Sequence, residues 1–464
     1  MTINTLPDFV LLQIFHFDRV KHFDEVGDGD SDRLCFPWRW DRLVHVCWRW
    51  RSIVFASPKF LDLRLVCVSN TRLELLGIWP PLPIIITDIY LPIFDFNTAI
   101  EHHSRVCEIH LFRLTTLQLR RLVSAMQEKF LPLIHLALSS VGTASPVPAL
   151  PDGFLGGSAS LLQSLELRWI PFPALPKLLL SATNLVHLSL EGSPDSGYIQ
   201  PQVIVTSLAA MANLKSLAIG FALPQSFFDQ ESQSPPPPTC NILYALTCFK
   251  FKGVSEYLED LVARIDAPLL DFIQIVLFDR PAFNFPQLTR FMRRATKFEA
   301  PNEVCVYFIP DGFQVKSLPP RGGSHEEYRL EIIFKMLIWE HLPLAAKVFA
   351  SFLPSICMVH HLYIFCTPYL VSKFNATLMQ WLEIFCPFIA VKHFYICQEL
   401  AQWIVLWEQS TDVLPALETL FLNELQPSGR TQEAIEQFVA TRRLLGHPVA
   451  VSLWDGTGGR LQEH

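Results

Sequence analysis

The sequence predicts an α/β protein in which a small helical cap precedes a curved solenoid, with parallel strands on the concave side and helices outside. Two observations predict this fold. Two strongly apolar segments with helical spacing lie near the N-terminus, and a short apolar signature typical of a strand then recurs through the rest of the chain. We therefore expect a helical domain over 1–62, a transition over 63–105 and a repeat array over 106–464.

The first helix is expected to begin at Pro7 and Asp8. Proline suits an opening helical turn because its φ is fixed and it lacks an N–H, and the Asp8 carboxylate complements the positive helix N-terminus. The apolar residues that follow have helical spacing: Val10, Leu11, Ile14, Phe15 and Phe17.

A second helical segment follows an acidic insertion, Asp18 to Trp40. Its apolar residues again have helical spacing: Leu43, Val46, Cys47, Trp50, Ile53 and Val54. The segment ends at Ser57-Pro58. Two such helices within about 60 residues cannot bury this much apolar surface alone, so we expect them to need a partner.

The two segments together resemble the F-box. The residues that carry the resemblance are Leu6-Pro7-Asp8-Phe9-Val10-Leu11-Leu12-Gln13-Ile14-Phe15, then Leu43-x-x-Val46-Cys47-x-x-Trp50-Arg51 and Ser57-Pro58. In that family a small helical bundle docks on the Skp adaptor of a cullin-based ubiquitin ligase, and the rest of the chain selects the substrate.

The resemblance implies which residues contact the adaptor: Leu6, Pro7, Val10, Leu11, Ile14, Phe15, Leu43, Val46, Cys47, Trp50 and Arg51. The family usually joins the two halves by a short connector, and the insertion from Asp18 to Trp40 departs from that pattern. The alternative is that both helices form an ordinary cap on the downstream domain.

The body of the chain repeats the signature apolar-x-x-apolar-x-apolar, which predicts a strand with three inward side chains. Copies begin at Val106, Leu133, Leu162, Leu185, Leu214, Leu246, Leu270, Ala295, Val359, Val391 and Leu417, and a degenerate copy lies near Leu330-Ile332. The first five copies start 23 to 29 residues apart, which matches the leucine-rich repeat. Helical segments are expected between strands, for example over Thr115–Phe130 and Gln202–Ala212.

Side chains that alternate with the buried leucines are expected on the concave face. They are small or polar in the early copies and aromatic in the later ones, which predicts a target-binding set: Phe272, Tyr363, Phe365, His393, Tyr395 and Phe421. Exposed aromatic clusters are typical of protein-recognition hot spots. Two alternatives remain open: inserted loops cover these rings, or a one-residue shift in register places them in the core.

Composition argues against several other classes of function. The net charge is −7 and the basic residues form only doublets, which disfavours nucleic-acid binding. Eleven cysteines show no Cys-x-x-Cys pair, and the sequence has no phosphate loop, Gly-x-Ser-x-Gly or His-Glu-x-x-His. We therefore expect no metal, no cofactor and no enzymatic activity.

The expected location is intracellular, in the cytoplasm or nucleus, with reduced thiols. The chain opens without a charged region followed by an apolar run, so a secretory signal is not expected. Its longest charge-free stretch, Val348 to Ser372, is interrupted by Pro354 and Pro368, which disfavours a membrane-spanning helix.

These observations predict a non-enzymatic substrate receptor of a ubiquitin ligase. The F-box-like cap would bind a Skp-type adaptor and, through it, a cullin, while the repeat array would bind an unknown target protein for ubiquitin-dependent degradation. Holding the target near activated ubiquitin raises its effective concentration without local chemistry. The alternative is a leucine-rich-repeat scaffold or inhibitor that acts without the ubiquitin machinery.

Overall fold

The computed structural model divides the chain into two compact units, Met1–Leu185 and Val186–His464. It describes residues 3–25, 40–67, 79–87, 100–141, 147–171, 175–193, 199–221, 240–278, 285–296, 301–309, 312–318, 329–335, 358–366, 384–401, 404, 413–423 and 429–454. The acidic insertion Asp18–Trp40 is thus described at its two ends.

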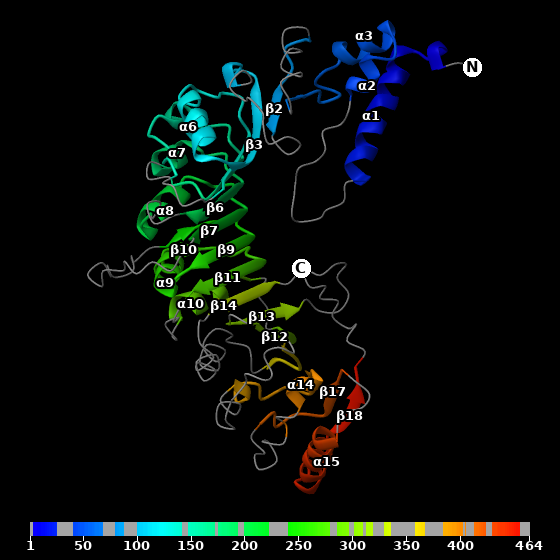
Figure 1. Ribbon diagram of the computed structural model, residues 1–464, viewed down its shortest axis with the longest axis vertical. Coiled ribbons are helices and arrows are strands. Elements are labelled where there is room, and N and C mark those ends of the chain that lie inside the picture. Colours follow the sequence, from blue (N-terminus) through cyan, green and yellow to red (C-terminus); the bar gives the residue numbers. More distant parts are fainter. Residues whose placement is uncertain are drawn as a thin grey trace. The chain divides into compact units, whose positions relative to one another are not determined.

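A short 3-10 helix, η1 (Ile3–Thr5), and three α-helices open the first unit: α1 (Asp8–Glu25), α2 (Asp41–Val44) and α3 (Trp48–Ala56), drawn in blue in Figure 1. As the sequence predicts, α1 begins directly after Pro7, with Asp8 in its first turn. Cys47 is the N-cap of α3, where its Sγ accepts a hydrogen bond from the Trp50 amide at 3.5 Å. The helix α1 continues beyond Phe17 into the acidic insertion.

The strands of the first unit pair in parallel and follow chain order: β1 (Leu65–Cys67), β2 (Ile84–Thr87), β3 (Val106–Leu114), β4 (His135–Ser140) and β5 (Ser164–Arg168). Between and after them lie α6 (Thr116–Ala125), the 3-10 helix η3 (Phe154–Gly157) and α7 (Leu175–Ser181). A capping box between Thr115 and Gln118 starts α6 directly after β3. This part of the chain therefore alternates strands with helical returns.

The second unit contains a longer sheet. Its strands lie in the order β6 (His187–Ser193), β7 (Ser216–Phe221), β9 (Cys248–Gly253), β11 (Phe272–Phe278), β14 (Leu330–Lys335), β13 (Gly312–Leu318), β12 (Glu303–Ile309), β15 (His361–Cys366), β16 (His393–Ile396), β17 (Thr419–Leu422) and β18 (Ala450–Leu453). Two further short strands, β8 (Asn241–Ile242) and β10 (Ile265–Asp266), pair with each other.

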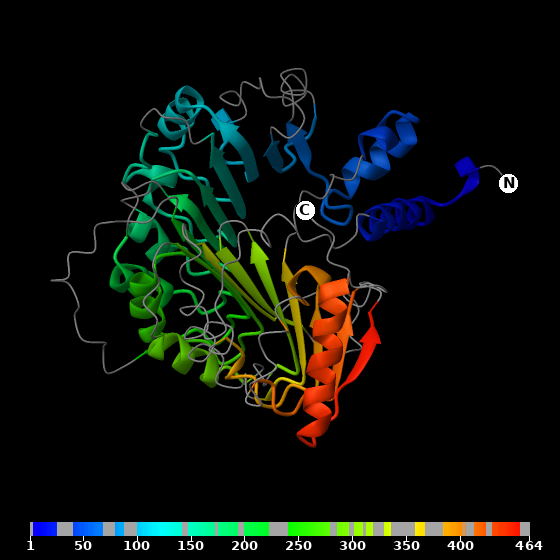
Figure 2. The same cartoon turned by 60° about the horizontal axis from the view of Figure 1, so that its bottom comes forward.

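Helices cover one face of this sheet. They are α8 (Pro201–Leu208), α9 (Ser255–Ala263), α10 (Pro286–Arg294), α14 (Gln398–Ala401) and α15 (Gly429–Leu444). Figure 1 shows α8, α9 and α10 along one side of β6 to β11, and Figure 2 shows α15 next to the last strands. On β9, Phe251 stacks on Tyr257 of α9 and Phe249 packs on Phe291 of α10. The alternating residues, Lys250 and Lys252, therefore point to the opposite face.

The predicted strand positions are confirmed with one exception. Every predicted copy other than that at Ala295 coincides with a strand, and the degenerate copy near Leu330 is β14. Ala295 is instead the C-cap residue of α10, and the next strand, β12, begins at Glu303. The α/β class is confirmed, with a large and mostly parallel sheet.

The expectation of parallel strands throughout is wrong at β13. This strand pairs antiparallel with both β12 and β14, whereas β14 is parallel to β11 and β12 is parallel to β15. Only Pro310-Asp311 separates β12 from Gly312, which has a φ of 153°. A Pro-Asp-Gly sequence favours a tight turn, so the chain reverses here without a returning helix.

None of the helices in the described ranges combines the length and the apolar character that crossing a membrane requires. The charge-free stretch Val348–Ser372 is described only over 358–366, where it forms β15.

Candidate protein-docking surfaces

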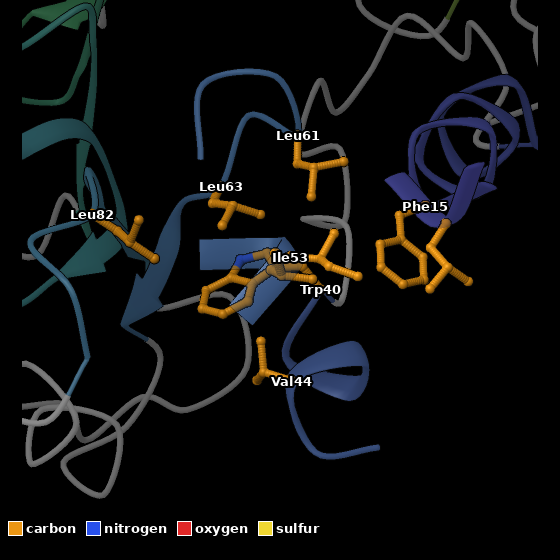
Figure 3. Packing of buried hydrophobic residues seen from close by; sticks show 9 residues of the cluster. Phe15, Trp40, Val44, Ile53, Leu61, Leu63 and Leu82 are labelled. Atoms are coloured by element: carbon orange, nitrogen blue, oxygen red, sulfur yellow. The ribbon is translucent and has the colours of Figure 1, made fainter. Parts of the chain in front are cut away.

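The N-terminal helices share a hydrophobic core with the segment that leads into the sheet (Figure 3). The buried members are Leu11, Phe15, Trp40, Val44, Ile53, Val54, Leu61, Leu63 and Leu82. Trp40 lies at the centre of this core, where its Nε1 donates a hydrogen bond to the Arg64 carbonyl at 2.8 Å and its ring lies 4.9 Å from that of Trp79. The helices are thus packed against the chain that enters β1 and β2.

Five of the predicted adaptor-binding residues contribute to this core. Leu11 and Phe15 are 0% and 1% exposed. Three others are partly buried and pack against the same cluster: Leu6, Leu43 and Trp50. The Trp50 ring lies 4.8 Å from that of Phe15, so it joins α3 to α1. In the chain by itself these side chains hold the helices together.

The other predicted adaptor-binding residues lie at the surface or its edge. Pro7, Ile14, Val46 and Arg51 are exposed, and Val10 and Cys47 are half-buried. Arg51 donates from Nε to the Val44 carbonyl at 2.9 Å, which connects α3 to the end of α2.

A second apolar face of α1 is open. Phe9 is 70% exposed, Phe17 67% and Ile14 40%. Helical spacing places these three and Val10 on an arc of about 140°, which borders the arc of Leu11 and Phe15 at Ile14. We call Phe9, Val10, Ile14 and Phe17 the helix face. The apolar residues of this helix thus form two surfaces, one packed in the core and one exposed.

Exposed apolar residues continue near the helix face. Trp48, at the start of α3, is 79% exposed, and the neighbouring Val46 is also exposed. Phe60 is also exposed, and its ring lies 4.9 Å from that of His16, the residue before Phe17. Sequence reasoning did not single out Phe9, Trp48 or Phe60.

Arg49 fixes α3 relative to α1. Its guanidinium contacts Asp8 Oδ1 through Nε at 2.9 Å and Nη2 at 2.6 Å, and Nη2 also donates to the Leu6 carbonyl at 2.5 Å. These two hydrogen bonds to one carboxylate oxygen are charge-assisted, so they are stronger than neutral ones and restrict the orientation of the guanidinium. This arrangement holds the first turn of α1, and with it Phe9, in position.

The predicted target-binding aromatics gather on the sheet of the second unit. Tyr395 stacks on Tyr363 at 4.1 Å and on Phe421 at 4.3 Å, and Tyr307 stacks on Phe365 at 4.7 Å. These five rings form an aromatic ladder across β12, β15, β16 and β17. Trp454 packs on the ladder, 5.5 Å from Tyr395 and 5.4 Å from Phe365.

Accessibility differs along the ladder. Tyr363 and Tyr395 are buried together with Cys305 and Trp454, whereas Phe365 and Phe421 are half-buried. His393 is also half-buried and stacks on His361 at 4.6 Å. Trp454 directly follows β18. Sequence reasoning did not anticipate that it packs on Tyr395 and Phe365, because these residues are far from Trp454 in the chain.

Phe272 lies apart from the ladder. It is on β11, three strand spacings from β12, the nearest strand of the ladder, which is about 14 Å. Its ring lies under the Lys250 ammonium, 5.6 Å from Nζ to the ring centroid. The predicted set therefore divides into the ladder with its neighbouring histidine and a separate lysine–phenylalanine contact.

A buried carboxylate, Glu331, lies on β14, between Phe272 on β11 and the aromatic ladder. The side-chain amides of Gln274 and Gln314 donate to it, and Lys316 Nζ lies 3.3 Å from its Oε1. Lys316 also lies over the Tyr307 ring, at 5.6 Å. The charge of Glu331 is thus compensated within the sheet face.

A second charged cluster lies on the sheet of the first unit. Glu108 of β3 pairs with Arg64 and lies 3.2 Å from His110 Nε2, and His135 is its partner in register on β4. Burial opposes ionisation of Glu108, but the hydrogen bond with His110 and the Arg64 charge outweigh it, so the pKa of Glu108 lies below its ordinary value.

Two buried cysteines, Cys107 and Cys305, lie on strands β3 and β12. Burial raises the pKa of the Cys107 and Cys305 thiols to about 12, so both stay protonated near neutral pH. Within the described ranges no three His, Cys, Asp or Glu side chains are placed to hold a metal ion.

Neither a protein-family model nor a curated protein sequence matches this chain.

Proposed function

We propose that this chain is the substrate receptor of a Skp-cullin-F-box ubiquitin ligase, acting in the cytoplasm or nucleus. Its N-terminal helices would dock on a Skp-type adaptor and its sheet would bind the target. The strand spacing and the helices on one face support an irregular leucine-rich-repeat solenoid as the architecture of the target-binding part.

The helix face carries this proposal. A helix with one apolar side in a packed core and a second apolar side in water leaves surface that a partner can bury. Arg49 holds the first turn of that helix, so the face is preorganised for binding.

The test is co-expression with a Skp-type adaptor, followed by size-exclusion chromatography. Ile14→Asp combined with Phe17→Asp should abolish the complex, because each change places a charge where an apolar contact is expected. Truncating one hot-spot residue costs about 2 kcal/mol, which is about thirtyfold in affinity. Leu117→Asp on α6 is the matched control, because Leu117 is exposed in the same unit but far from the helix face in sequence.

Failure of the unsubstituted chain to bind the adaptor while it remains folded would reject the proposal. A second candidate would then apply: a repeat scaffold or inhibitor that acts without the ubiquitin machinery. The observation that favours this candidate is the core shared by Phe15, Trp40 and Leu82, because it makes the helices an integral cap of the first strands.

A further inference from the structure

Two lysines on β9 lie on the face of the second unit's sheet opposite α9 and α10. Lys250 and Lys252 alternate with Phe249 and Phe251, whose rings pack on the helices, so both ammonium groups lie on the side away from the helices. Lys250 is half-buried and Lys252 is exposed. We call this pair the lysine strip.

Each ammonium is held by an aromatic ring. Lys250 Nζ lies 5.6 Å from the centroid of Phe272, and Lys252 Nζ lies 5.5 Å from that of Phe278. Rings at this distance attract a cation without neutralising it. The two charges are therefore positioned but not compensated by the rings.

The immediate neighbours leave the strip accessible. On β7, the register partners of Lys250 and Lys252 are Ala218 and Gly220, which carry almost no side chain. On β11, the partner of Lys250 is Gln274, whose amide is directed to Glu331. Among the described residues, neither lysine of the strip has a carboxylate within 4 Å, in contrast to Lys316 with Glu331.

Carboxylates on either side limit the kind of anion that fits. The backbones of Glu191 on β6 and Glu331 on β14 each lie two strand spacings from β9, about 10 Å away. Their side chains reach closer: Glu191 packs over Gly220, the register partner of Lys252, and Glu331 accepts from Gln274, the register partner of Lys250. A broad polyanion such as a nucleic acid or a membrane surface would meet both. A short segment that runs along β9 would lie between them.

We infer that the lysine strip binds an extended acidic segment of the target, in which two carboxylate side chains two residues apart meet Lys250 and Lys252. Alternate residues of an extended peptide are about 6.7 Å apart, the same backbone spacing as that of Lys250 and Lys252 on β9. The two ammonium groups diverge from there toward Phe272 and Phe278, so the carboxylate side chains of the peptide would diverge in the same way. Phe272 and Phe278 offer apolar contact to residues beside the acidic pair. The inference rests on the proposed function only in calling the bound segment part of a target.

The test is fluorescence anisotropy with the full chain and labelled twelve-residue peptides that carry Asp-x-Asp or Glu-x-Glu flanked by Leu or Phe. We expect binding that weakens about tenfold in the double variant Lys250→Ala, Lys252→Ala, since each close charge pair contributes up to about 1 kcal/mol. Lys250→Arg with Lys252→Arg should retain binding. Arg290→Ala with Arg293→Ala on α10 is the control, because it removes two exposed cations of the same unit.

Several outcomes would overturn the inference. These are no binding by any acidic peptide, equal binding of the matched Asn-x-Asn and Gln-x-Gln peptides, and no loss of binding in the Lys→Ala variant. Lysine-dependent binding of single-stranded DNA or phosphatidylserine vesicles in place of the peptides would also overturn it.

The result is separable from the proposed function. Ile14→Asp with Phe17→Asp should leave peptide binding unchanged, and the Lys→Ala variant should still bind the adaptor. Loss of adaptor binding alone would reject the ligase role and leave the lysine strip intact as a peptide site.

Discussion

The neighbouring side chains determine whether the charge of a residue in this protein is compensated. Glu108 and Glu331 are both poorly exposed carboxylates on strands of the sheet. Glu108 is stabilised by Arg64 and His110, and Glu331 by Lys316 and two amides. Lys250 and Lys252, by contrast, each lie over an aromatic ring, and among the described residues neither forms an ion pair. Paired charges maintain the fold, whereas the uncompensated ones are available to a ligand.

The lowered pKa of Glu108 predicts a loss of stability in acid. A depressed folded-state pKa means that the ionised carboxylate adds stability above the unfolded-state pKa, and that this stability is lost as pH falls through the folded-state value. The free energy of unfolding in urea should therefore fall below about pH 5, and Glu108→Gln should flatten this dependence.

At pH 7 the Glu108→Gln variant should be less stable by about 1 to 3 kcal/mol, because Arg64 loses one of its two carboxylate partners and keeps only Asp62 among the described residues. Glu101→Gln is the control, since Glu101 is exposed in the same unit. A pH profile of Glu108→Gln that matches the unsubstituted chain would contradict the assignment.

At the scale of elements, α1 demonstrates what spacing can and cannot predict. Pro7 and Asp8 predict where the helix begins, and the spacing of the apolar residues predicts that the segment is helical. Spacing cannot show that Leu11 and Phe15 face the core while Phe9 and Phe17 face water, because both pairs have helical separation. The other side of the core comes from Trp40, Ile53 and Leu82, whose contacts depend on the folded chain.

The two sides of α1 should respond differently to truncation. Leu11→Ala or Phe15→Ala should destabilise the chain by about 2 to 5 kcal/mol, because each leaves a cavity in the core. Phe9→Ala and Phe17→Ala should change stability by less than about 0.5 kcal/mol. Urea unfolding measures both, and equal losses on the two sides would show that the helix face is covered.

The strand β13 depends on one glycine. A Cβ at Gly312 would lie 1.7 Å from the Phe334 carbonyl oxygen, and the φ of 153° is unfavourable for other residues. Gly312→Ala should therefore lower the free energy of unfolding by about 2 kcal/mol or more. Gly429→Ala on α15 is the control, since a Cβ there meets nothing within 4 Å.

At the scale of the whole molecule, the two units carry different candidate surfaces. The helix face belongs to Met1–Leu185 and the lysine strip to Val186–His464. A substrate receptor needs both, because it brings a target to a ligase without performing chemistry itself. Independent surfaces should give independent effects when substituted.

This independence predicts the behaviour of a three-component mixture. Adaptor, chain and acidic peptide should elute together on size-exclusion chromatography, and the Ile14→Asp, Phe17→Asp variant should lose only the adaptor. The Lys250→Ala, Lys252→Ala variant should lose only the peptide. Coupled losses in either variant would contradict separate sites.

The sequence by itself determined the α/β class, most of the strand positions and the start of α1, because these depend on local spacing, turn residues and helix-end chemistry. Only the tertiary structure decided which side of α1 stays open, that β13 reverses direction, and that Trp454 packs over Tyr395. Burial and strand pairing join residues far apart in the chain, and a local pattern contains no information about which distant residue becomes the partner.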